Sequence, residues 1–524
     1  MILRTVHRAL ISVSKKKGLE VFAKGLAELS VEIISTGGTA KALREAGIPV
    51  KEISEITGFP EILNGRVKTL HPKVHGGLLG IRGNPEHQRQ MLENGIVPID
   101  LVVVNPYPFE ETIVKPGVSF EEIIENIDIS GPSMIRSAAK NFQDVAVVVN
   151  PDDYDWVLKE LKRERACLSL GTRFQLAQKA FCLTASYDAA IASYLSRIRL
   201  DEKLFQLEEG FPPKMVLALE KVSDLRYGEN PHQRAAFYRE STSFDSVLPD
   251  SIQLQGKELS YNNIIDLNAA FQLTQEFETA CAVIIKHTNP CGVAISLNSQ
   301  TEAYVKAREC DPLSAFGSVL GFNRILEKET AQEIVLTFVE AIIAPEYSSE
   351  ALGLLSSKKN LRLIKYLHPE KLHPLDYQRV EGGLLVQEVD RLKLEKDQWK
   401  VVTKRNPSDE ETRGLAFAWK VVKHVKSNAI VYANTNQTVG IGAGQMSRVD
   451  SARFGISKAI LPIRGCVMAS DAFFPFRDGI DVAAQAGIQA VIQPGGSVKD
   501  EEVIQAANEH GMAMIVTGVR HFKH

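Results

Sequence analysis

The sequence predicts an α/β protein with more than one domain. From Arg8 onward, short β-branched runs alternate with amphipathic helical patterns, which is typical of a largely parallel sheet. The chain has 524 residues, more than a single hydrophobic core normally organises. A second region adds strand patterns that end in polar and glycine-rich residues, which indicates further α/β structure.

The elements of the first region follow in order along the chain. The predicted strands are RALISVS, VEIIS, DLVVVN and DVAVVVN. The predicted helices run to about Leu29, from Thr39 to Ala46, and over about residues 152–163 and 172–198. The charged, proline-containing segment DEKLFQLEEGFPPK then interrupts the alternation. We therefore expect two domains, 1–200 and 201–524.

The second region begins with the loop-rich segment LRYGENPHQRAAFY. The strand patterns ACAVIIKH and AIVYANTNQTVGIGAGQ follow, and the carboxyl-terminal part adds CVMASDAFF, AVIQPGG and MAMIVTG. Because this region is long enough for more than one core, we expect it to contain two subdomains.

Composition narrows the possible partners. A net charge of −3, from 61 basic and 64 acidic residues, argues against a broad basic face for nucleic acid. The six cysteines are widely spaced and form no C-x-x-C pair, so neither a disulfide framework nor a zinc knuckle is expected. The sequence shows no signal peptide and no apolar run near the ~18 residues of a membrane span. We expect a cytoplasmic protein with no nucleic-acid or membrane partner.

The first candidate site is a phosphate-binding helix start. The residues STGGT follow the apolar run VEII and open the helix AKALREAG, so free backbone N–H groups converge at a positive helix end. GRVKTLHPKVHGG places five basic side chains between glycines, and NPYPF follows a strand end, where open α/β sheets bind ligands. Each segment alone also fits a glycine turn, a solvated loop or a helix cap. Together they predict a site for an anionic ligand.

The second candidate site is KHTNPCG, Lys286 to Gly292. It fits half of a zinc site, a cysteine nucleophile activated by histidine, a Lys-His pair for proton transfer and oxyanion stabilisation, or a strand end closed by a turn. A zinc deaminase requires P-C-x-x-C together with H-x-E, but Pro290-Cys291 is followed three residues on by Ala294, and no H-x-E accompanies this segment. The residues alone leave the pair and the turn open; in both, Asn289, Pro290 and Gly292 are expected to shape the turn.

The N-terminal motifs resemble a known family. STGGTAKAL, GFPEILNGRVKTLHPKVHGG, NPYPF and D-I-x-G-P-S-M-I-R-x-A-A-K-N are similar to the inosine monophosphate (IMP) cyclohydrolase domain of a bifunctional purine biosynthesis family, whose fold resembles methylglyoxal synthase. The resemblance implies catalysis by Lys68, Tyr107, Asp128 and Lys140. It implies substrate binding by Ser12, Ser14, Lys16, Thr36, Gly37, Gly38, Thr39, Arg66 and Thr69. The sequence departs from the family pattern at SKKKG (residues 14–18), Pro106 and Ser130.

The C-terminal motifs resemble the folate-dependent transformylase domain of the same family, which has two cytidine-deaminase-like subdomains. They are LRYGENPHQ, LSYNNIIDLNAA, KHTNPCGVA, DPLSAFG, SNAIVYA, IGAGQMSR, SDAFFPFRDGID, IQPGGSVKDEE and TGVRHFKH. The resemblance implies that His287 is the base, that Lys286 stabilises an oxyanion and that Asn428 orients the substrate. It implies substrate contacts from Arg226, Tyr227, Phe316, Gly317, Arg448, Phe473 and Arg520, and folate contacts from Gln445 and Asp478. Cys291 then becomes a packing residue.

The resemblance covers nearly the whole chain and implies a complete function. Formyl transfer from 10-formyltetrahydrofolate to aminoimidazole carboxamide ribonucleotide (AICAR) would give formyl-AICAR (FAICAR), and cyclodehydration of FAICAR would give IMP, with no metal required. The implied assembly is a homodimer with a shared transformylase site. One alternative is that the N-terminal domain senses a phosphorylated metabolite without catalysis. A further alternative is a zinc-dependent deaminase.

Overall fold

The computed structural model of the protein describes residues 2–201, 204–207, 210–241, 245–393 and 398–524. The chain separates into two compact units. Unit 1 is Met1–Glu220 with Glu240–Ser243, and unit 2 is Lys221–Arg239 with Phe244–His524. Both units contain β-sheets with helices packed against them, as the predicted α/β class requires.

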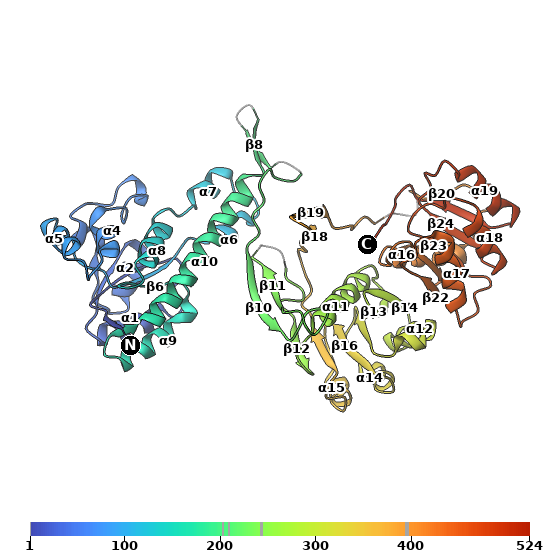
Figure 1. The fold of residues 1–524 in the computed structure, drawn as a ribbon, viewed down its shortest axis with the longest axis horizontal. Helices are drawn as coiled ribbons and strands as arrows, with labels where there is room; N and C mark the ends of the chain where they lie inside the picture. The colour runs from blue at the N-terminus through green and yellow to red at the C-terminus, as the bar shows by residue number, and fades with distance from the viewer. Residues whose placement is uncertain (1, 202–203, 208–209, 242–244, 394–397) are drawn as a thin grey trace. The chain divides into compact units, whose positions relative to one another are not determined.

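Unit 1 contains a five-stranded, fully parallel sheet in the order β4-β3-β2-β5-β6 (Figure 1). Its strands are β2 (Arg8–Val13), β3 (Glu32–Ser35), β4 (Lys51–Glu52), β5 (Leu101–Asn105) and β6 (Ala146–Val148). Their apolar, β-branched sequences suit strands that are buried on both faces. The chain runs from β2 outward to β4 and then returns to β5 on the other side. Ligands bind to such sheets at the carboxyl ends of the strands where this reversal occurs, here between β2 and β5.

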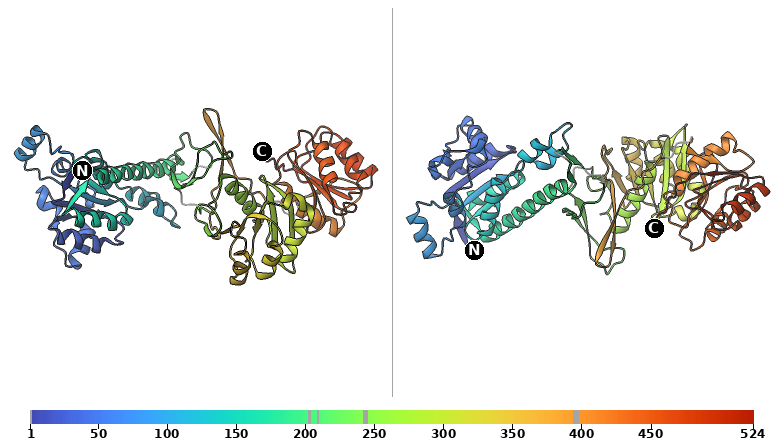
Figure 2. Two further views of the ribbon diagram at one scale, coloured as in Figure 1. Left: turned by 60° about the horizontal axis from the view of Figure 1, so that its bottom comes forward. Right: turned by 90° about the horizontal axis from the view of Figure 1, so that it is seen from above.

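Helices cover both faces of this sheet because each presents an apolar stripe to it. Helices α1 (Leu19–Glu28) and α9 (Tyr154–Arg163) share a core with one face, and α4 (Pro72–Leu79) and α8 (Ser130–Lys140) share a core with the other. In α8 the buried side chains recur at helical spacing, which explains its orientation. The long helix α10 (Leu170–Leu195) can be followed in Figure 2.

Shorter elements complete unit 1 and its boundary. The further helices are α2 (Gly37–Glu45), α3 (Ile53–Thr57), α5 (Pro85–Glu93), α6 (Phe109–Ile113) and α7 (Phe120–Glu125). Two-stranded sheets pair β1 (Leu3–Thr5) with β7 (Cys167–Ser169), β8 (Ile198–Asp201) with β9 (Leu204–Leu207), and β10 (Leu219–Leu225) with β11 (Ala235–Glu240).

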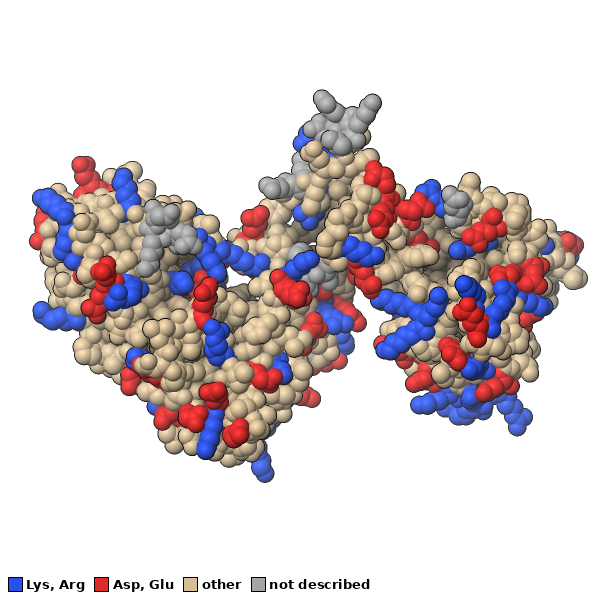
Figure 3. Space-filling view, turned by 180° about the vertical axis from the view of Figure 1, so that it is seen from behind, with Lys and Arg blue, Asp and Glu red and all other residues tan. Residues whose placement is uncertain are grey.

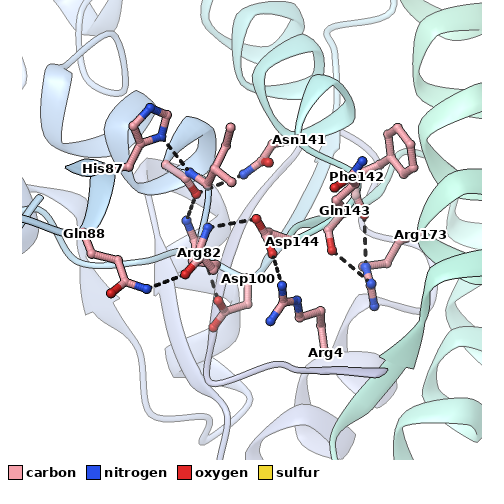
Figure 4. A network of polar contacts seen from close by, with 12 residues as sticks. Arg4, Arg82, His87, Gln88, Asp100, Asn141, Phe142, Gln143, Asp144 and Arg173 are labelled. Atoms are coloured by element: carbon pink, nitrogen blue, oxygen red, sulfur yellow. Dashed lines mark hydrogen bonds and ion pairs between the residues drawn. The ribbon is translucent and has the colours of Figure 1, made fainter. Parts of the chain in front are cut away.

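A polar network lies near the amino ends of strands β5 and β6 (Figure 4). The Arg82 guanidinium donates to two backbone carbonyl oxygens at 2.8 and 2.9 Å and lies 3.7 Å from Asp100, the residue before β5. Asp144, close to the start of β6, accepts the Arg82 backbone N–H at 2.9 Å and pairs with Arg4 at 2.8 Å. Ion pairs and hydrogen bonds therefore occupy this edge, whereas the candidate ligand site lies at the opposite edge.

Unit 2 contains two six-stranded mixed sheets of the same topology. Their orders are β12-β17-β16-β15-β13-β14 and β20-β25-β24-β23-β21-β22. The first consists of β12 (Ile252–Gln255), β13 (Ala280–Lys286), β14 (Asn289–Ser296), β15 (Ser318–Phe322), β16 (Val339–Ala344) and β17 (Arg362–Lys365). The second consists of β20 (Lys400–Val401), β21 (Ile430–Ala433), β22 (Thr438–Gly442), β23 (Val467–Ser470), β24 (Ala490–Gln493) and β25 (Ala513–Val516). Corresponding neighbours are parallel or antiparallel in the same way in both sheets.

The helices repeat with the sheets. Helix α11 (Tyr261–Thr274) and helix α16 (Asp409–Val422) begin 148 residues apart and have the same length. The same separation relates α12 (Gln300–Cys310) to α17 (Arg448–Lys458). We call the two repeats the first and second halves of unit 2. Residues 148 apart are called equivalent over the segments from α11 to β15 and from α16 to β23. The predicted pair of subdomains is thus a duplicated fold.

Other elements of unit 2 are shorter. They are α13 (Pro312–Ala315), α14 (Lys328–Ile334), α15 (Ser349–Leu355), α18 (Asp478–Gln485), α19 (Asp500–Glu509) and the hairpin of β18 (Leu375–Val380) and β19 (Gly383–Glu388).

The two halves of unit 2 share a core and an edge. Helices α11 and α16 contribute side chains to one continuous apolar cluster. The edge strands β14 and β22 lie side by side, where the Val293 N–H donates to Thr438 Oγ1 at 2.9 Å and the Ile295 N–H donates to Asn436 O at 2.9 Å. The halves therefore position each other through both apolar packing and backbone hydrogen bonds.

The surface carries mixed charge. Lys and Arg lie interspersed with Asp and Glu on the face in Figure 3. None of the helices in the described ranges has the length and apolar character needed to cross a membrane. Within the same ranges, no group of three or more His, Cys, Asp or Glu is arranged to hold a metal ion.

Candidate functional site

The site in unit 1 forms where α2 begins, at the carboxyl end of β3. Thr36 is the extended residue before the helix, and Gly37 has a φ of 46°, which favours glycine. A Cβ placed on Gly37 would lie 3.9 Å from Lys68 Nζ, and a Cβ placed on Gly38 would lie 3.9 Å from Lys16 Nζ. Two ammonium groups therefore converge on a helix N-terminus, which is an arrangement that binds phosphate. Among the described residues, neither ammonium has a carboxylate partner.

The loop after β2 is tied to β5 at the reversal of strand order. Ser12 Oγ lies 3.3 Å from Thr36 Oγ1. Asn105 Oδ1 accepts the Ser14 N–H and hydroxyl at 2.7 and 2.8 Å and the Lys15 N–H at 3.0 Å. Asn105 therefore shapes the loop. The motif NPYPF points to this region. The signal for the loop-shaping role of Asn105 is that it is the last residue of a buried strand.

The lysines of SKKKG turn in different directions. Lys15 pairs with Glu111 at 2.6 Å and Lys17 lies 3.7 Å from Asp152, whereas Lys16 extends to Gly38. The departure from the family pattern at Lys15 and Lys17 therefore falls on side chains that are paired elsewhere.

Asp128 is held in front of α8. Its Oδ1 accepts the Gly131 N–H at 2.9 Å and the Ser130 hydroxyl at 3.3 Å, and its own N–H donates to Tyr187 Oη at 2.9 Å. A Cβ on Gly131 would lie 2.5 Å from the Asp128 carboxylate, so this position requires glycine. The departure at Ser130 adds a donor to the carboxylate and leaves it in place.

The other predicted residues of unit 1 have varied surroundings. Thr39 is engaged structurally, because its Oγ1 bonds both the N–H and the carbonyl oxygen of Val13 at 3.1 Å. The buried Thr69 hydroxyl has no partner among the described residues, and Tyr107 is exposed. Arg66 pairs with Glu125 of α7.

Lys140 lies at the far end of α8 from Asp128. The 11 residues of α8 rise by about 16 Å. Lys140 is the exposed last residue, whereas Asp128 precedes the first. Unit 1 does not bring these two side chains together, and the role of Lys140 in ring closure stays a prediction.

KHTNPCG forms the tip of the β13–β14 hairpin. Lys286 pairs with Asn289, and His287 and Thr288 form the two-residue turn between them with φ angles of 51° and 62°. Positive φ at both central residues is the mark of a type I′ turn, which matches the twist of the flanking strands.

The prediction that Pro290 and Gly292 shape this turn is wrong, because both lie in β14 beyond it. Asn289, the first residue of β14, does close the turn opposite Lys286, and its Nδ2 donates to the carbonyl oxygen of His287 at 3.3 Å. Proline is tolerated there because β14 is an edge strand. Gly292 serves helix packing instead, since a Cβ on it would lie 1.9 Å from the carbonyl oxygen of Ala307 in α12.

Lys286 is a fixed cation beside an open imidazole. Its Nζ donates to the carbonyl oxygens of Phe316 and Gly317 at 3.0 and 2.9 Å. Gly317 has a φ of 68°, and a Cβ on it would lie 3.3 Å from Lys286 Nζ. The exposed His287 imidazole has no hydrogen-bond or ion-pair partner within the described ranges. This pair can accept a proton and stabilise a neighbouring oxyanion.

Cys291 is partly buried and packs against the apolar core of the first half of unit 2. Burial raises the pKa of its thiol far above the usual range, so the thiol stays protonated near neutral pH. Its Sγ faces the carbonyl oxygen of Ile284 at 3.6 Å. These surroundings fit a packing role for Cys291 and not the role of a catalytic nucleophile.

Asn428 and Arg448 belong to a buried cluster in the second half. The Arg448 guanidinium pairs with Asp471 at 2.5 Å, donates to Ser470 Oγ at 2.8 Å and donates to Asn428 Oδ1 at 2.8 Å. Its side chain is 5% exposed. Arg448 therefore positions Asn428 and neutralises Asp471. Sequence reasoning missed Asp471, although it lies in the motif SDAFFPFRDGID.

The remaining predicted residues of unit 2 lie in other segments of the chain. Arg226 and Arg520 are exposed, with their guanidinium groups 5.4 Å from the Tyr227 ring and 4.3 Å from the Phe522 ring. Phe316 and Phe473 are exposed, and Asp478 is half-buried at the start of α18.

The structure gathers seven of the predicted residues of unit 2 into two clusters. Lys286, His287, Phe316 and Gly317 form one. Asn428, Arg448 and Gln445 form the other, where the Asn428 Nδ2 donates to Gln445 O at 2.8 Å. The Lys426 N–H, which donates to Asn289 Oδ1 at 2.9 Å, links the second cluster to the catalytic turn.

A parallel α/β unit with two lysines at a helix start is followed by a duplicated α/β unit with a Lys-His turn. This combination suits an enzyme that acts on small anionic substrates. Residues 18–133 match the family model of the MGS-like domain, and residues 138–458 match that of the AICARFT/IMPCHase bienzyme. The chain belongs to the AICARFT/IMPCHase bienzyme family.

Two known proteins are similar to this chain. The bifunctional purine biosynthesis protein PurH of Magnetococcus marinus is 55% identical over 533 aligned residues, which cover 99% of each chain. A solved structure described as the crystal structure of ForH is 41% identical, covers 35% of this chain and 94% of its own, and has a TM-score of 0.33.

These findings confirm the predicted family, fold class and bifunctional activity. The chain carries AICAR formyltransferase and IMP cyclohydrolase activities in purine biosynthesis. The assignment of each activity to particular residues is taken up next.

Proposed function

We propose that ring closure takes place in unit 1 and formyl transfer in unit 2, with the domain boundary near residue 200 and 10-formyltetrahydrofolate as the formyl donor. The observation that carries the proposal is that each unit has its own set of basic groups open to a ligand. Lys16 and Lys68 converge on the start of α2, and His287 lies beside the clamped Lys286. The first set consists of two cations at a helix start, whereas the second pairs an imidazole with a cation.

Formyl transfer needs a base and an oxyanion donor. The 5-amino nitrogen of AICAR attacks the formyl carbon while the His287 imidazole removes its proton. The Lys286 ammonium stabilises the tetrahedral oxyanion. Collapse of this intermediate breaks the bond to N10 of tetrahydrofolate, which leaves with a proton. Asn428 orients AICAR, and Gln445 and Asp478 lie toward the folate.

Ring closure needs orientation more than covalent assistance. FAICAR contains both the carboxamide nitrogen and the formyl carbon that join, so holding it in a reactive conformation removes much of the barrier. In this proposal the start of α2 with Lys16 and Lys68 binds the phosphate, and Thr69 offers a free hydroxyl. Asp128 accepts a proton from the attacking amide, and Tyr107 donates one to the formyl oxygen, which becomes a hydroxyl. This hydroxyl leaves as water with the proton held by Asp128, while the formamido nitrogen returns its proton to Tyr107 as the ring C=N bond forms.

We also propose a cytoplasmic homodimer that completes the transformylase site. Exposed apolar side chains between residues 200 and 220 offer a surface for association, among them Leu200, Phe211 and Leu219 at 61, 56 and 55% exposure. The cysteines are free thiols, which fits a reducing compartment.

A pair of variants in the full chain tests the assignment. His287→Ala should lower formyl transfer by about a thousandfold and leave cyclisation of supplied FAICAR unchanged. Lys68→Met should show the reverse pattern. Equal loss of both activities in a folded variant would contradict two separate sites. Cyclisation that survives Lys68→Met while nucleotide binding weakens would favour a sensor role for unit 1.

A further inference from the structure

The catalytic turn adopts a conformation that its residues do not favour. Type I′ turns have positive φ at both central positions, which Asn and Gly tolerate best. Here those positions hold His287 and the β-branched Thr288. A left-handed non-glycine residue is costly and persists only when its surroundings hold it. Some group outside the turn must therefore fix it.

Asp266 of α11 supplies that group. Its Oδ1 accepts the Thr288 backbone N–H at 2.7 Å, and the His287 N–H also faces the carboxylate. Burial raises the pKa of this carboxyl, although the Thr288 N–H and the neighbouring His287 and Lys286 favour its charged form. Within the turn, Thr288 Oγ1 and Asn289 Nδ2 donate to the carbonyl oxygen of His287, and at its end Asn289 Oδ1 accepts the Lys426 N–H. Asp266 thus connects the tip to a helix.

The second half of unit 2 provides an internal comparison. Gly414 of α16 is equivalent to Asp266, and a Cβ on it would lie 3.1 Å from the carbonyl oxygen of Asn434, so a longer side chain has no room. The turn that corresponds to the catalytic one has no residue with positive φ. The Asn434 side chain holds it from within, accepting the N–H groups of Asn436 and Gln437 at 3.0 and 2.9 Å. The external carboxylate occurs only where the turn carries the Lys-His pair.

We propose that Asp266 is a positioning residue for formyl transfer: through the Thr288 N–H it holds the left-handed turn that directs the His287 imidazole at the substrate. This inference rests on the proposed role of His287. Asp266 itself does not touch the substrate in this proposal, and an amide oxygen at the same place can accept the same hydrogen bond.

Three variants of the full chain test the proposal. Asp266→Ala should lower kcat for formyl transfer by about ten- to a hundredfold, as expected for a misplaced catalytic group, with the KM for AICAR changed less than about threefold. Asp266→Asn keeps the acceptor and should restore kcat to within about threefold of the parent. Asn268→Ala, an exposed position on the same helix, serves as the matched control and should change neither constant. Cyclisation of FAICAR in each preparation reports that the chain is folded.

A second experiment asks whether the turn is the intermediary. Glycine at position 288 adopts positive φ without strain, so Asp266→Ala should reduce kcat less in a Thr288→Gly background than in the parent. If Asp266→Ala does not fold, Asp266→Ser replaces it, because serine is too short to reach the Thr288 N–H.

The outcomes separate the two proposals. His287→Ala with full transfer activity would overturn the role of His287 itself. An inactive His287→Ala together with an unaffected Asp266→Ala would overturn the positioning role alone. An Asp266→Asn variant as poor as Asp266→Ala would also overturn it, because charge and not the hydrogen bond would then be required.

Discussion

The two halves of unit 2 have the same strand order and matching helices, yet they differ in charge at equivalent buried positions. After β15 the first half has Asn323, whose Oδ1 accepts the Cys281 N–H at 2.9 Å. After β23 the second half has Asp471, whose Oδ1 accepts the Ala429 N–H at 3.1 Å. The fold requires an acceptor at this place, and an amide or a carboxylate can provide it.

Whether this acceptor is an amide or a carboxylate determines whether a cation must lie beside it. A carboxylate in the interior needs a nearby cation, and Arg448 at the start of α17 supplies it. At the equivalent start of α12 the neutral Asn323 needs none, and Gln300 stands there. The comparison shows that the buried ion pair belongs to the second half and not to the shared fold.

Breaking that ion pair should have the largest effect. Arg448→Gln leaves Asp471 charged and without a cation, and should lower the free energy of unfolding by about 3–5 kcal/mol. Urea unfolding of the full chain, followed by a probe in unit 2, measures this change.

The double variant Arg448→Gln with Asp471→Asn copies the neutral residues of the first half. It should recover more than half of the lost stability, because no unpaired charge remains. A double variant as unstable as the single one would show that the shape of Arg448, not the charge of Asp471, matters.

Acid should act at the contact between the halves. Glu276 and His424 occupy equivalent positions after α11 and α16 and bond to each other at 3.0 Å. Burial disfavours the charged Glu276, but the hydrogen bond of His424 and the charge of Lys423 at 3.1 Å outweigh it and lower the pKa of Glu276 to about 2. Burial lowers the pKa of His424, so near neutral pH Lys423 supplies the positive charge.

The sign of the pH effect follows from the lowered pKa. The charged Glu276 stabilises unit 2 fully above the unfolded pKa of a glutamate, and this contribution, up to about 3 kcal/mol, is lost as pH falls from about 4.5 toward 2. Glu276→Gln should remove this part of the pH dependence. Denaturant midpoints measured from pH 6 to 3 would disprove the assignment if both proteins lost stability equally.

Much of the fold could be predicted from the sequence, as could the segments that carry both candidate sites. Alternating β-branched runs mark the strands of unit 1 because parallel strands are buried on both faces. The glycines and lysines near the start of α2 predict a phosphate site because helix N-termini bind anions, and this stays a prediction.

The remaining features depend on contacts between residues that are far apart in the sequence, so local patterns could not predict them. Asn289 and Pro290 resemble turn residues, but strand register placed the turn at His287 and Thr288, whose positive φ no local preference indicates. Arg448 resembles an open phosphate ligand in IGAGQMSR, and only the fold shows that Asp471 occupies it. Asp266 lies 22 residues before the N–H that it accepts, so no local pattern links the two.

The smallest predicted effects concern two equivalent glycines at which a helix packs closely against a sheet, one in each half. Gly292 and Gly440 are equivalent, and a Cβ on them would lie 1.9 Å from the Ala307 carbonyl oxygen and 2.3 Å from the Gly455 carbonyl oxygen. Each Gly→Ala variant should lower the free energy of unfolding by about 1–3 kcal/mol, because a helix must move away from its sheet. Gly353→Ala, in a helix with open space around it, should be neutral or stabilising. Only Gly292→Ala should also slow formyl transfer, because β14 carries the catalytic turn; an equal loss from Gly440→Ala would mean that the second half determines the position of that turn as well.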